Sequence, residues 1–562
     1  MTINGSLQVG RSALLASQTA LQVAGNNMAN AATPGFHRRS IHLAPQTTEY
    51  VNAQARVGRG VQILSVRREV DTGLQARFRD ATGNNARSLI DQRFLTSIET
   101  LQNELTDNDL STTLSRFFNA FSELANTPDD SAVRALVIQE GVTLSDRIVT
   151  LRKDYQDVIG EIDKDISSTV REVNDLLDRI ATANAEIIKT ESSAGEASSL
   201  RDFRDVLIDE LSEFIEVDVL EHPSGSTDIL VNSIPVLLAG VNRGLEVRSE
   251  SDGDVRNLSI RVAADGTTLN VQSGRLGGLL EQRDGTVNPV INQLNTFAGQ
   301  LINQVNRVHA QGQGEIGFES ATGTYLIDDT TINLNSFDSG LKFPVDNGSF
   351  FVHVTHKETG IRSSYQINVD GNADSLDDLI TRLNTAVPNV TASTGLGNVL
   401  QLDAVDGYEF SFSDDSSGAL AALGVNTFFT GSRASDIDVN QRLIDDPQRL
   451  AADSGHLIGN GGTALAIANL QDTRYSELGD ASLREYWQNS VNQLAVRTSA
   501  ANNAVASTQL VSESLSAQIQ AVSGVSLDEE SLNLLTFQRQ FQAAARFISV
   551  IDETLQTLLS IA

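Results

Sequence analysis

The chain has 562 residues, no cysteine, and 41 basic against 72 acidic residues, so its formal net charge is −31. The missing cysteines exclude disulfides, thiol catalysis and thiolate zinc sites. The acidic balance argues against nucleic acid as a partner, and the length suggests about three or four domains.

The N-terminal segment predicts a helix with one narrow apolar stripe over residues 3–30. Large apolar residues recur there every seven positions, as Leu7, Leu14, Leu21 and Met28. Polar residues interrupt this stretch, so we expect no membrane insertion. No apolar block with a cleavage site follows the first basic residue, Arg11, so any export would proceed without a cleavable signal peptide.

Residues 26–36 allow two interpretations. The first is a helix exit and turn, because Asn tolerates left-handed backbone and Pro34 ends a helix. The second is a subunit contact, because a run of amides precedes an aromatic residue. The candidate contact residues are Asn26, Asn27, Asn30, Thr33, Gly35 and Phe36.

The middle of the chain alternates helical and β-prone segments. Apolar spacing predicts a short helix near 114–124, a long one over about 130–190, and another over about 198–215. If unbroken at Gly141 and Gly160, the long helix would extend roughly 90 Å. Helices are also expected over 290–308, 375–385 and after about 440. Short β-prone runs in 216–272 and 315–430 predict hairpins.

The C-terminal segment predicts a coiled-coil helix. Ser526 and Glu529 have capping-box spacing, and apolar residues then fill both stripe positions of five heptads. These residues are Leu527, Leu534, Phe537, Phe541, Ala544, Ile548, Ile551, Leu555, Leu558 and Ala562. Such a stripe requires a partner helix to cover it.

These elements predict an α+β multidomain protein, in which both chain ends build an elongated helical coiled-coil stalk and β-rich domains are inserted into it. Residues 1–75 plus 525–562 would form a terminal coiled-coil layer. Residues 76–314 plus 431–524 would form the stalk, with a small β excursion at about 216–272. Residues 315–430 would form an outer β-rich domain.

We find no pattern that predicts an enzyme, a metal site or a cofactor. His353 and His356 would lie on opposite faces of a strand as surface residues. Asp370, Asn372 and Asp374 imitate the start of a calcium loop, but Ser375 and Thr381 replace the required Gly and Glu, which favours helix capping instead. No catalytic residue is assigned.

A family resemblance adds to this interpretation. The run Asn-Asn-x-Ala-Asn-x-x-Thr-x-Gly-Phe at 26–36 resembles the signature of bacterial flagellar rod, hook and hook-associated proteins, and residues 534–546 resemble their C-terminal helix. Three internal stretches are similar to the hook-associated protein 1 family. They are Leu-Arg-Asp-Phe-Arg-Asp at 200–205, Leu-Gly-Gly-Leu-Leu-Glu-Gln-Arg-Asp at 276–284, and Phe-Thr-Gly-Ser-Arg-Ala-Ser-Asp-Ile-Asp-Val at 429–439.

The resemblance implies a structural subunit at the junction between flagellar hook and filament, outside the cell. Its partners would be copies of itself in a junction ring, the hook protein, a second hook-associated junction protein, an export chaperone and the flagellar type III export apparatus. In related axial proteins both terminal segments are disordered in the free monomer and become helical on assembly.

We therefore expect the terminal helices to form the assembly interface. Leu7, Leu14, Leu21 and Met28 would pack against Leu534, Phe541, Ile548 and Leu555, within and between subunits, with Leu527, Phe537, Ile551 and Leu558 completing the stripe. Two alternatives remain open. One is another flagellar axial role, of hook or rod type, and the other is an adhesin or enzyme activity carried by residues 315–430.

Overall fold

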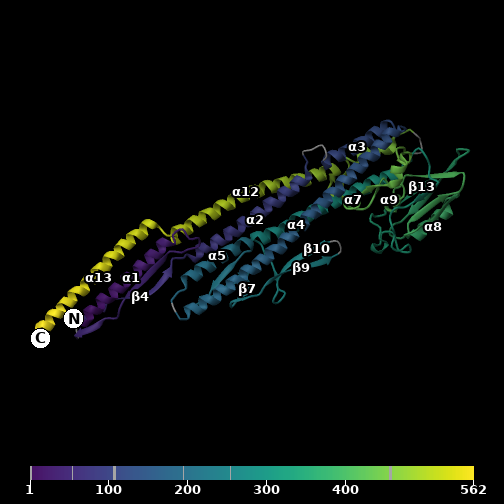
Figure 1. Cartoon of the computed structure of the whole chain (residues 1–562). Coiled ribbons are helices and arrows are strands. Elements are labelled where there is room, and N and C mark those ends of the chain that lie inside the picture. The colour runs from purple at the N-terminus through teal and green to yellow at the C-terminus, as the bar shows by residue number, and fades with distance from the viewer. Residues whose placement is uncertain are drawn as a thin grey trace. The chain divides into compact units, whose positions relative to one another are not determined.

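The computed structural model describes residues 3–52, 55–104, 109–193, 195–252, 255–454 and 459–561 of an α+β multidomain chain (Figure 1). Ala562, the last predicted stripe residue, lies outside this range. The chain divides into two compact units. Unit 1 comprises Met1–Arg93, Ile162–Gln282 and Ala500–Ala562, and unit 2 comprises Phe94–Glu161 and Arg283–Ser499.

Most of the long helices form where the apolar periodicity predicted them, whereas the helix over residues 72–102 was not predicted. Helix α4, Ser131–Glu191, runs unbroken for 61 residues through both glycines. A Cβ at Gly141 would lie 2.7 Å from the Phe428 ring, so glycine is needed for that close approach. The other long helices are α2 (Thr72–Gln102), α3 (Leu110–Asn126), α5 (Ser198–Phe214), α7 (Asn288–Ala310) and α12 (Leu483–Ser523).

Unit 1 contains the two terminal helices, α1 (Ile3–Ala29) and α13 (Leu527–Ile561), which lie side by side (Figure 1). Four strands that the sequence analysis did not anticipate follow α1. Strands β1 (Arg39–Pro45) and β4 (Val61–Arg68) pair antiparallel, and β2 (Glu49–Asn52) and β3 (Ala55–Val57) form the hairpin between them. Residues 1–75 are therefore not purely helical.

The β excursion of unit 1 agrees with the predicted hairpins of 216–272. Four antiparallel strands form one sheet, β5 (Asp218–Glu221), β6 (Thr227–Val231), β7 (Ile234–Leu238) and β8 (Val241–Asn242). Three more form a second sheet, β9 (Leu245–Asp252), β10 (Val255–Val262) and β11 (Thr268–Leu269). Helix α6 (Gly274–Glu281) follows and continues into a π-helical turn, Gln282–Val287.

Unit 2 has an aromatic core between its helices. Phe117 on α3 is fully buried and lies 5.4 Å from the ring of Phe428 and 5.5 Å from that of Phe429. Trp487 on α12 is buried against Phe297 of α7. The short elements of unit 2 outside its β-rich region are β18 (Phe429–Thr430), β19 (Asp438–Val439), α10 (Gln441–Asp445), α11 (Gly462–Asn469), β20 (Arg474–Tyr475) and β21 (Ala481–Ser482).

Residues 310–425 of unit 2 form a β-rich region with its own buried apolar core. It contains β12 (Ser320–Thr322), β13 (Gly348–His356), β14 (Arg362–Val369), β15 (Val390–Thr394), β16 (Leu400–Ala404), β17 (Tyr408–Ser413), α8 (Leu376–Ala386) and α9 (Ala419–Ala422). Two three-stranded sheets result, in the orders β14-β13-β17 and β12-β16-β15.

Two side-chain expectations in this region have different outcomes. Ser375 caps α8 through a capping box with Asp378, as the helix-capping interpretation predicts. The expected surface location of His353 is wrong. This residue is buried in the sheet, 2.6 Å from the Ser364 hydroxyl and 2.8 Å from that of Ser413, because neighbouring strands supply polar partners for both ring nitrogens.

Candidate assembly interface

The terminal helix pair, α1 with α13, is antiparallel. Near one end a Cβ on Gly10 would lie 2.7 Å from Cγ1 of Ile548. At the other end Asn27 Nδ2 donates a hydrogen bond to Glu530 Oε2 at 3.2 Å. The two contacts fix the register of one helix against the other.

On α13, the heptad stripe faces α1. Ala544 and Ile551 are buried, and the remaining central members, Leu534, Phe537, Phe541, Ile548 and Leu555, are half-buried. The first and last stripe positions are not covered, since Leu527 is 54% and Leu558 53% exposed. One partner helix therefore covers the middle of the stripe and leaves its ends in solvent.

On α1, the most buried residues are small or polar. The buried positions are Gly10, Ala16, Ser17, Ala20, Ala24 and Asn27. The leucines that the sequence analysis favoured flank this surface. Leu7 is 40% exposed, and Leu14, Leu21 and Met28 are half-buried. Gly10 lets α13 approach α1 closely, and the bulky residues on the same side of α1 remain only partly covered by a single partner helix.

An open apolar groove runs beside the terminal helix pair. It encloses about 500 Å³ and is lined by α1, α13 and the strands β1 and β4. Leu43 and Val61 supply its strand side, and Phe537 and Phe547 supply its helical side. The groove provides space for an apolar side chain from outside the unit.

A polar junction holds the end of α1 to the start of α13. It consists of Asn27, Arg38, Arg39 and Glu530. Glu530 is only 2% exposed, and Arg38 Nε donates to its Oε1 at 2.9 Å. Asn27 donates to the Arg39 carbonyl at 3.0 Å and accepts from the Arg39 amide at 3.0 Å. The long-range partners of the buried carboxylate thus come from the N-terminal motif and the chain just after it, and Asn533 of α13 adds a local hydrogen bond at 3.3 Å.

The same junction fixes the bend between α12 and α13. The Arg38 amide donates to the carbonyl of Ser523, the last residue of α12, at 2.8 Å. The Arg38 carbonyl accepts from the Glu69 amide at 2.8 Å, directly after β4. Arg38 therefore connects three segments that are far apart in the sequence.

The turn after α1 docks on α5. Gly35 has a φ of +71°, and a Cβ there would lie 2.2 Å from Cγ2 of Val206. Phe36 is half-buried under the guanidinium of Arg39, 5.0 Å from its ring centroid. Asn26, Thr33 and Gly35 are exposed, and Asn30 donates to the Asn26 carbonyl at 2.9 Å. The segment after α1 is therefore a turn, as the first interpretation of residues 26–36 predicts, and the subunit contact of the second interpretation stays a prediction.

An ionic cluster beneath this turn was missed by sequence reasoning. Asp202 on α5 lies 2.8 Å from His37 Nδ1 and 3.0 Å from Arg68 NH1. Arg68 also pairs with Asp205 at 2.7 Å. Although burial opposes it, pairing with these two carboxylates raises the pKa of Arg68. The 200–205 motif carried the family resemblance, yet nothing in its spacing indicates which basic residues it meets.

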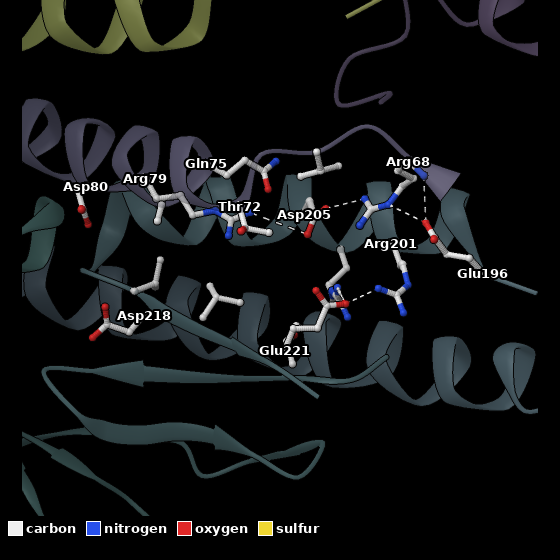
Figure 2. A pocket seen from close by; sticks show the side chains of 16 residues that line it. Arg68, Thr72, Gln75, Arg79, Asp80, Glu196, Arg201, Asp205, Asp218 and Glu221 are labelled. Carbon is white, nitrogen blue, oxygen red and sulfur yellow. Dashed lines mark hydrogen bonds and ion pairs between the residues drawn. The ribbon is translucent and has the colours of Figure 1, made fainter. Parts of the chain in front are cut away.

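The ionic cluster continues into a cavity of about 370 Å³ between α2, α5 and β5, shown in Figure 2. Arg201 pairs there with Glu221 and with Glu191, at 2.7 Å for the latter. The hydrogen bond to Arg201 lowers the pKa of Glu191. At the other end of the cavity, burial and repulsion by Asp218 raise the pKa of Asp80. Most of the guanidinium and carboxylate groups that line the cavity pair with each other. These ion pairs hold α5 in place under the turn.

The described residues contain no group of three or more His, Asp or Glu side chains arranged to hold a metal ion. Within the same ranges, no helix combines the length and apolarity needed to cross a bilayer.

Comparisons with known proteins match both chain ends and the middle. Residues 95–323 match the model of the flagellar hook-associated protein FlgK helical domain. Residues 7–37 match the flagella basal body rod protein model, and residues 518–561 match the flagellar basal body rod FlgEFG protein C-terminal model.

Curated relatives match the chain over nearly its whole length. Flagellar hook-associated protein 1 of Escherichia coli is 25% identical, over 98% of both chains. Flagellar hook-associated protein 1 of Bacillus subtilis is 24% identical, over 99% of this chain and 97% of its own. A solved structure, the flagellar hook junction protein FlgK from Burkholderia pseudomallei, is 14% identical with a TM-score of 0.49, covering 80% of this chain and 100% of its own. Over nearly its whole length the chain is therefore similar to flagellar hook-associated protein 1, and residues 95–323 match the helical domain of a flagellar hook-associated protein.

Proposed function

We propose that this chain is a structural subunit of the bacterial flagellum that joins hook to filament and polymerises through its terminal helices. The observation that carries the proposal is the incomplete coverage of the terminal helix pair. Helix α13 exposes Leu527, Leu532, Leu535, Phe547, Val550, Leu558 and Leu559. Apolar side chains gathered along one helix mark a surface that another protein covers.

The assembly contacts follow from this geometry. The central stripe of α13, from Leu534 to Leu555, would pack on α1 of the same chain. Leu7, Leu527 and Leu558, which the pair leaves exposed, would be covered by neighbouring copies. The exposed Asn26 and Thr33, with the half-buried Asn30, would meet the next subunit at the turn.

The internal match favours the hook-associated role over the other axial roles. The models that match both ends are those of rod proteins, so the ends alone are common to several axial proteins. The match over 95–323 is to a hook-associated helical domain. The β-rich region 310–425 would be carried as an additional domain of the structural subunit.

The proposed partners are copies of the same chain in a junction ring, the hook protein and a second hook-associated junction protein. Export outside the cell through the flagellar type III apparatus is part of the proposal. An export chaperone would cover the apolar stripe of α13 beforehand, because exposed apolar helices associate in solution.

The test is complementation in a bacterium that encodes this chain and from which its gene has been deleted. Restored expression should return filaments to bare hooks, and an antibody label on the chain should lie between hook and filament. Hooks that stay bare although the chain is exported would overturn the proposal, as would labelling along the hook or the rod.

A further inference from the structure

The β-rich region of unit 2 exposes two apolar side chains almost completely. Leu396 is 99% and Phe337 is 98% exposed, and no other large apolar side chain in the described ranges exceeds 75%. Both lie in turns, Leu396 between β15 and β16 and Phe337 in the 3₁₀ turn Phe337–Ser339. Turns of this kind are normally built from polar residues and glycine, so folding does not account for these two side chains.

Hydrogen bonds hold the two turns beside a third segment. Asn398 Nδ2 donates to the carbonyl of Ile327 at 3.0 Å. The amide of Asp328 donates to the carbonyl of Ser339 at 2.9 Å. All three segments are therefore fixed at one place on the β-rich region. We call residues 326–329, 337–340 and 395–398 the apolar tip.

Leu326 adds a third large apolar side chain to the apolar tip. A Cβ on Gly397 would lie 2.4 Å from Cδ2 of Leu326, so this leucine packs beside the turn that carries Leu396. Gly397 has a φ of +81°, so a glycine is favoured there on both counts. Leu326 is still 63% exposed. One leucine or phenylalanine thus protrudes from each of the three segments.

The apolar tip is also acidic. Asp328, Asp329 and Asp338 are exposed beside the apolar residues. Residues 326–342 contain one base, Lys342, and residues 395–398 contain no charged residue. Carboxylates attract cations and repel phosphate groups. The charge of the apolar tip therefore favours a partner whose outermost groups are positive.

We propose that the apolar tip inserts Leu326, Phe337 and Leu396 into the surface of a bilayer of zwitterionic phosphatidylcholine. This lipid places trimethylammonium groups outermost, where the carboxylates of the apolar tip attract them. The ring of Phe337 can contact the same groups by a cation–π interaction. The inference goes beyond the proposed function, because it gives the β-rich region a partner outside the flagellum.

The geometry favours a bilayer over a protein as the partner. A protein would need a recess shaped for each side chain, because the three protrude from separate turns. Lipid chains rearrange around protruding apolar side chains without any preformed recess. Three side chains reach only the boundary between head groups and acyl chains, so the contact is shallow and reversible.

The experiment follows one end of the β-rich region with a fluorophore. The chain has no cysteine, so a single introduced cysteine carries an environment-sensitive label. Thr394→Cys, exposed at the end of β15, reports on the apolar tip. Thr359→Cys, exposed in the hairpin between β13 and β14, is the matched reporter. That hairpin contacts the turn after β16, since the Lys357 amide donates to the Gly407 carbonyl at 2.9 Å, whereas residues 395–398 precede β16.

The labelled full-length chain is titrated with vesicles of phosphatidylcholine alone. Emission of the Thr394→Cys label should shift to the blue as it enters an apolar environment, and that of the Thr359→Cys label should not. Leu396→Ser and Phe337→Ser should each weaken the vesicle binding reported by the Thr394→Cys label about tenfold, because the buried apolar area is lost. Ile361→Ser, a change at a 68% exposed residue of the opposite hairpin, is the matched control and should have no effect.

Folding and assembly are measured separately from vesicle binding. Leu396→Ser and Phe337→Ser alter exposed side chains, so the unfolding transition of unit 2, reported by the single tryptophan Trp487, should not change. Both variants should still be incorporated between hook and filament, so a failure of the proposed function is detected independently. Vesicle association through the exposed apolar residues of α13 would leave the Thr394→Cys label in water.

The lipid composition tests the role of charge. Replacing one third of the phosphatidylcholine by anionic phosphatidylglycerol should weaken binding about threefold, and Asp328→Asn with Asp338→Asn should remove the difference. Stronger binding to the anionic vesicles would overturn the inference. An unshifted Thr394→Cys label in phosphatidylcholine vesicles would overturn it as well, and a shift caused only by added protein would assign the apolar tip to a protein partner instead.

Discussion

Two phenylalanines on amphipathic helices show how differently the terminal helix pair and unit 2 are stabilised. Phe117 on α3 is fully buried and contacts the rings of Phe118, Phe121, Phe428 and Phe429. Phe541 on α13 occupies a central stripe position and remains half-buried. Apolar periodicity identifies the face that must be covered in both helices, but it does not say whether the same chain covers it.

The difference has an energetic meaning. A helix stabilised by one thin contact must offset the conformational entropy of its residues with little buried area. Unit 2 buries its aromatic side chains from several directions at once. We therefore expect unit 2 to fold alone and the terminal helix pair to gain its stability from neighbouring subunits.

The largest expected effect separates assembly from folding. Phe541→Asp places a charge in the stripe, so incorporation at the junction should be lost. The unfolding transition of unit 2 should not change. Trp487 is the only tryptophan and is buried in unit 2, so its fluorescence in a denaturant titration reports that unit alone. Gln538→Asp is the matched control and should assemble normally. Assembly of Phe541→Asp at normal efficiency would contradict the account.

The converse change acts on unit 2. Phe117→Ala should lower its free energy of unfolding by about 3–5 kcal/mol, because a fully buried ring leaves a cavity. Phe541→Ala should leave the same Trp487 transition unchanged. Equal effects of the two substitutions on that transition would mean that the two regions fold as one cooperative unit.

The polar junction gives a smaller effect within the terminal helix pair. Glu530→Gln keeps the shape but removes the buried negative charge opposite Arg38, which should weaken assembly by about 1–3 kcal/mol. Glu529 is 63% exposed at its side chain and also contacts Arg38, so Glu529→Gln should cost well under about 1 kcal/mol. The effects of both substitutions are measured as changes in the concentration that the purified chain needs to polymerise. If Glu529→Gln weakened assembly more than Glu530→Gln, Glu530 would not be the residue that fixes the register of α13 against α1.

An effect comparable to that of Glu530→Gln is the pH dependence of unit 2. Burial lowers the pKa of His309 to about 4. The ring is neutral, because one nitrogen faces the Asn426 carbonyl at 2.8 Å and the other accepts from the Ala451 amide at 3.1 Å. Below about pH 6.5 the His309 ring binds a proton in the unfolded chain but not in the folded chain. The free energy of unfolding therefore falls as the pH falls.

Between pH 6.5 and 5 this loss should be about 2 kcal/mol for His309. Burial also lowers the pKa of His353, which adds in the same direction. The Trp487 transition at several pH values measures the slope, and His309→Gln should flatten it. An unchanged slope in that variant would show that His309 is not the group responsible.

The sequence predicted the elements whose periodicity is regular. The terminal helices, the 61-residue α4 and the hairpins of 216–272 lie where the patterns placed them. Strands β1 and β4 were missed, because buried and exposed positions do not alternate along them, so they lack the period of two that marks a strand. The leucine repeat of α1 pointed to Leu7 and Leu14, whereas the close contact of Gly10 with Ile548 could not be read from an apolar repeat, because a glycine carries no apolar side chain.

The polar contacts could not be predicted in the same way. Glu530 meets Arg38 and Asn27 across about five hundred residues of sequence, and no local pattern marks it as buried. Asp202 and Arg68 are likewise ordinary charged residues until α5 and β4 are placed together. Long-range ion pairs depend on the fold, whereas helix periodicity is local.

The most direct test of the account is hydrogen–deuterium exchange of the full chain, followed by mass spectrometry, before and after polymerisation. In the free chain, amides of α1 and α13 should exchange within seconds, while those of α3 and α7 stay protected. After polymerisation, α1 and α13 should become protected and unit 2 should not change. Terminal helices that are already as protected as α3 in the free chain would contradict the claim that neighbouring subunits complete them.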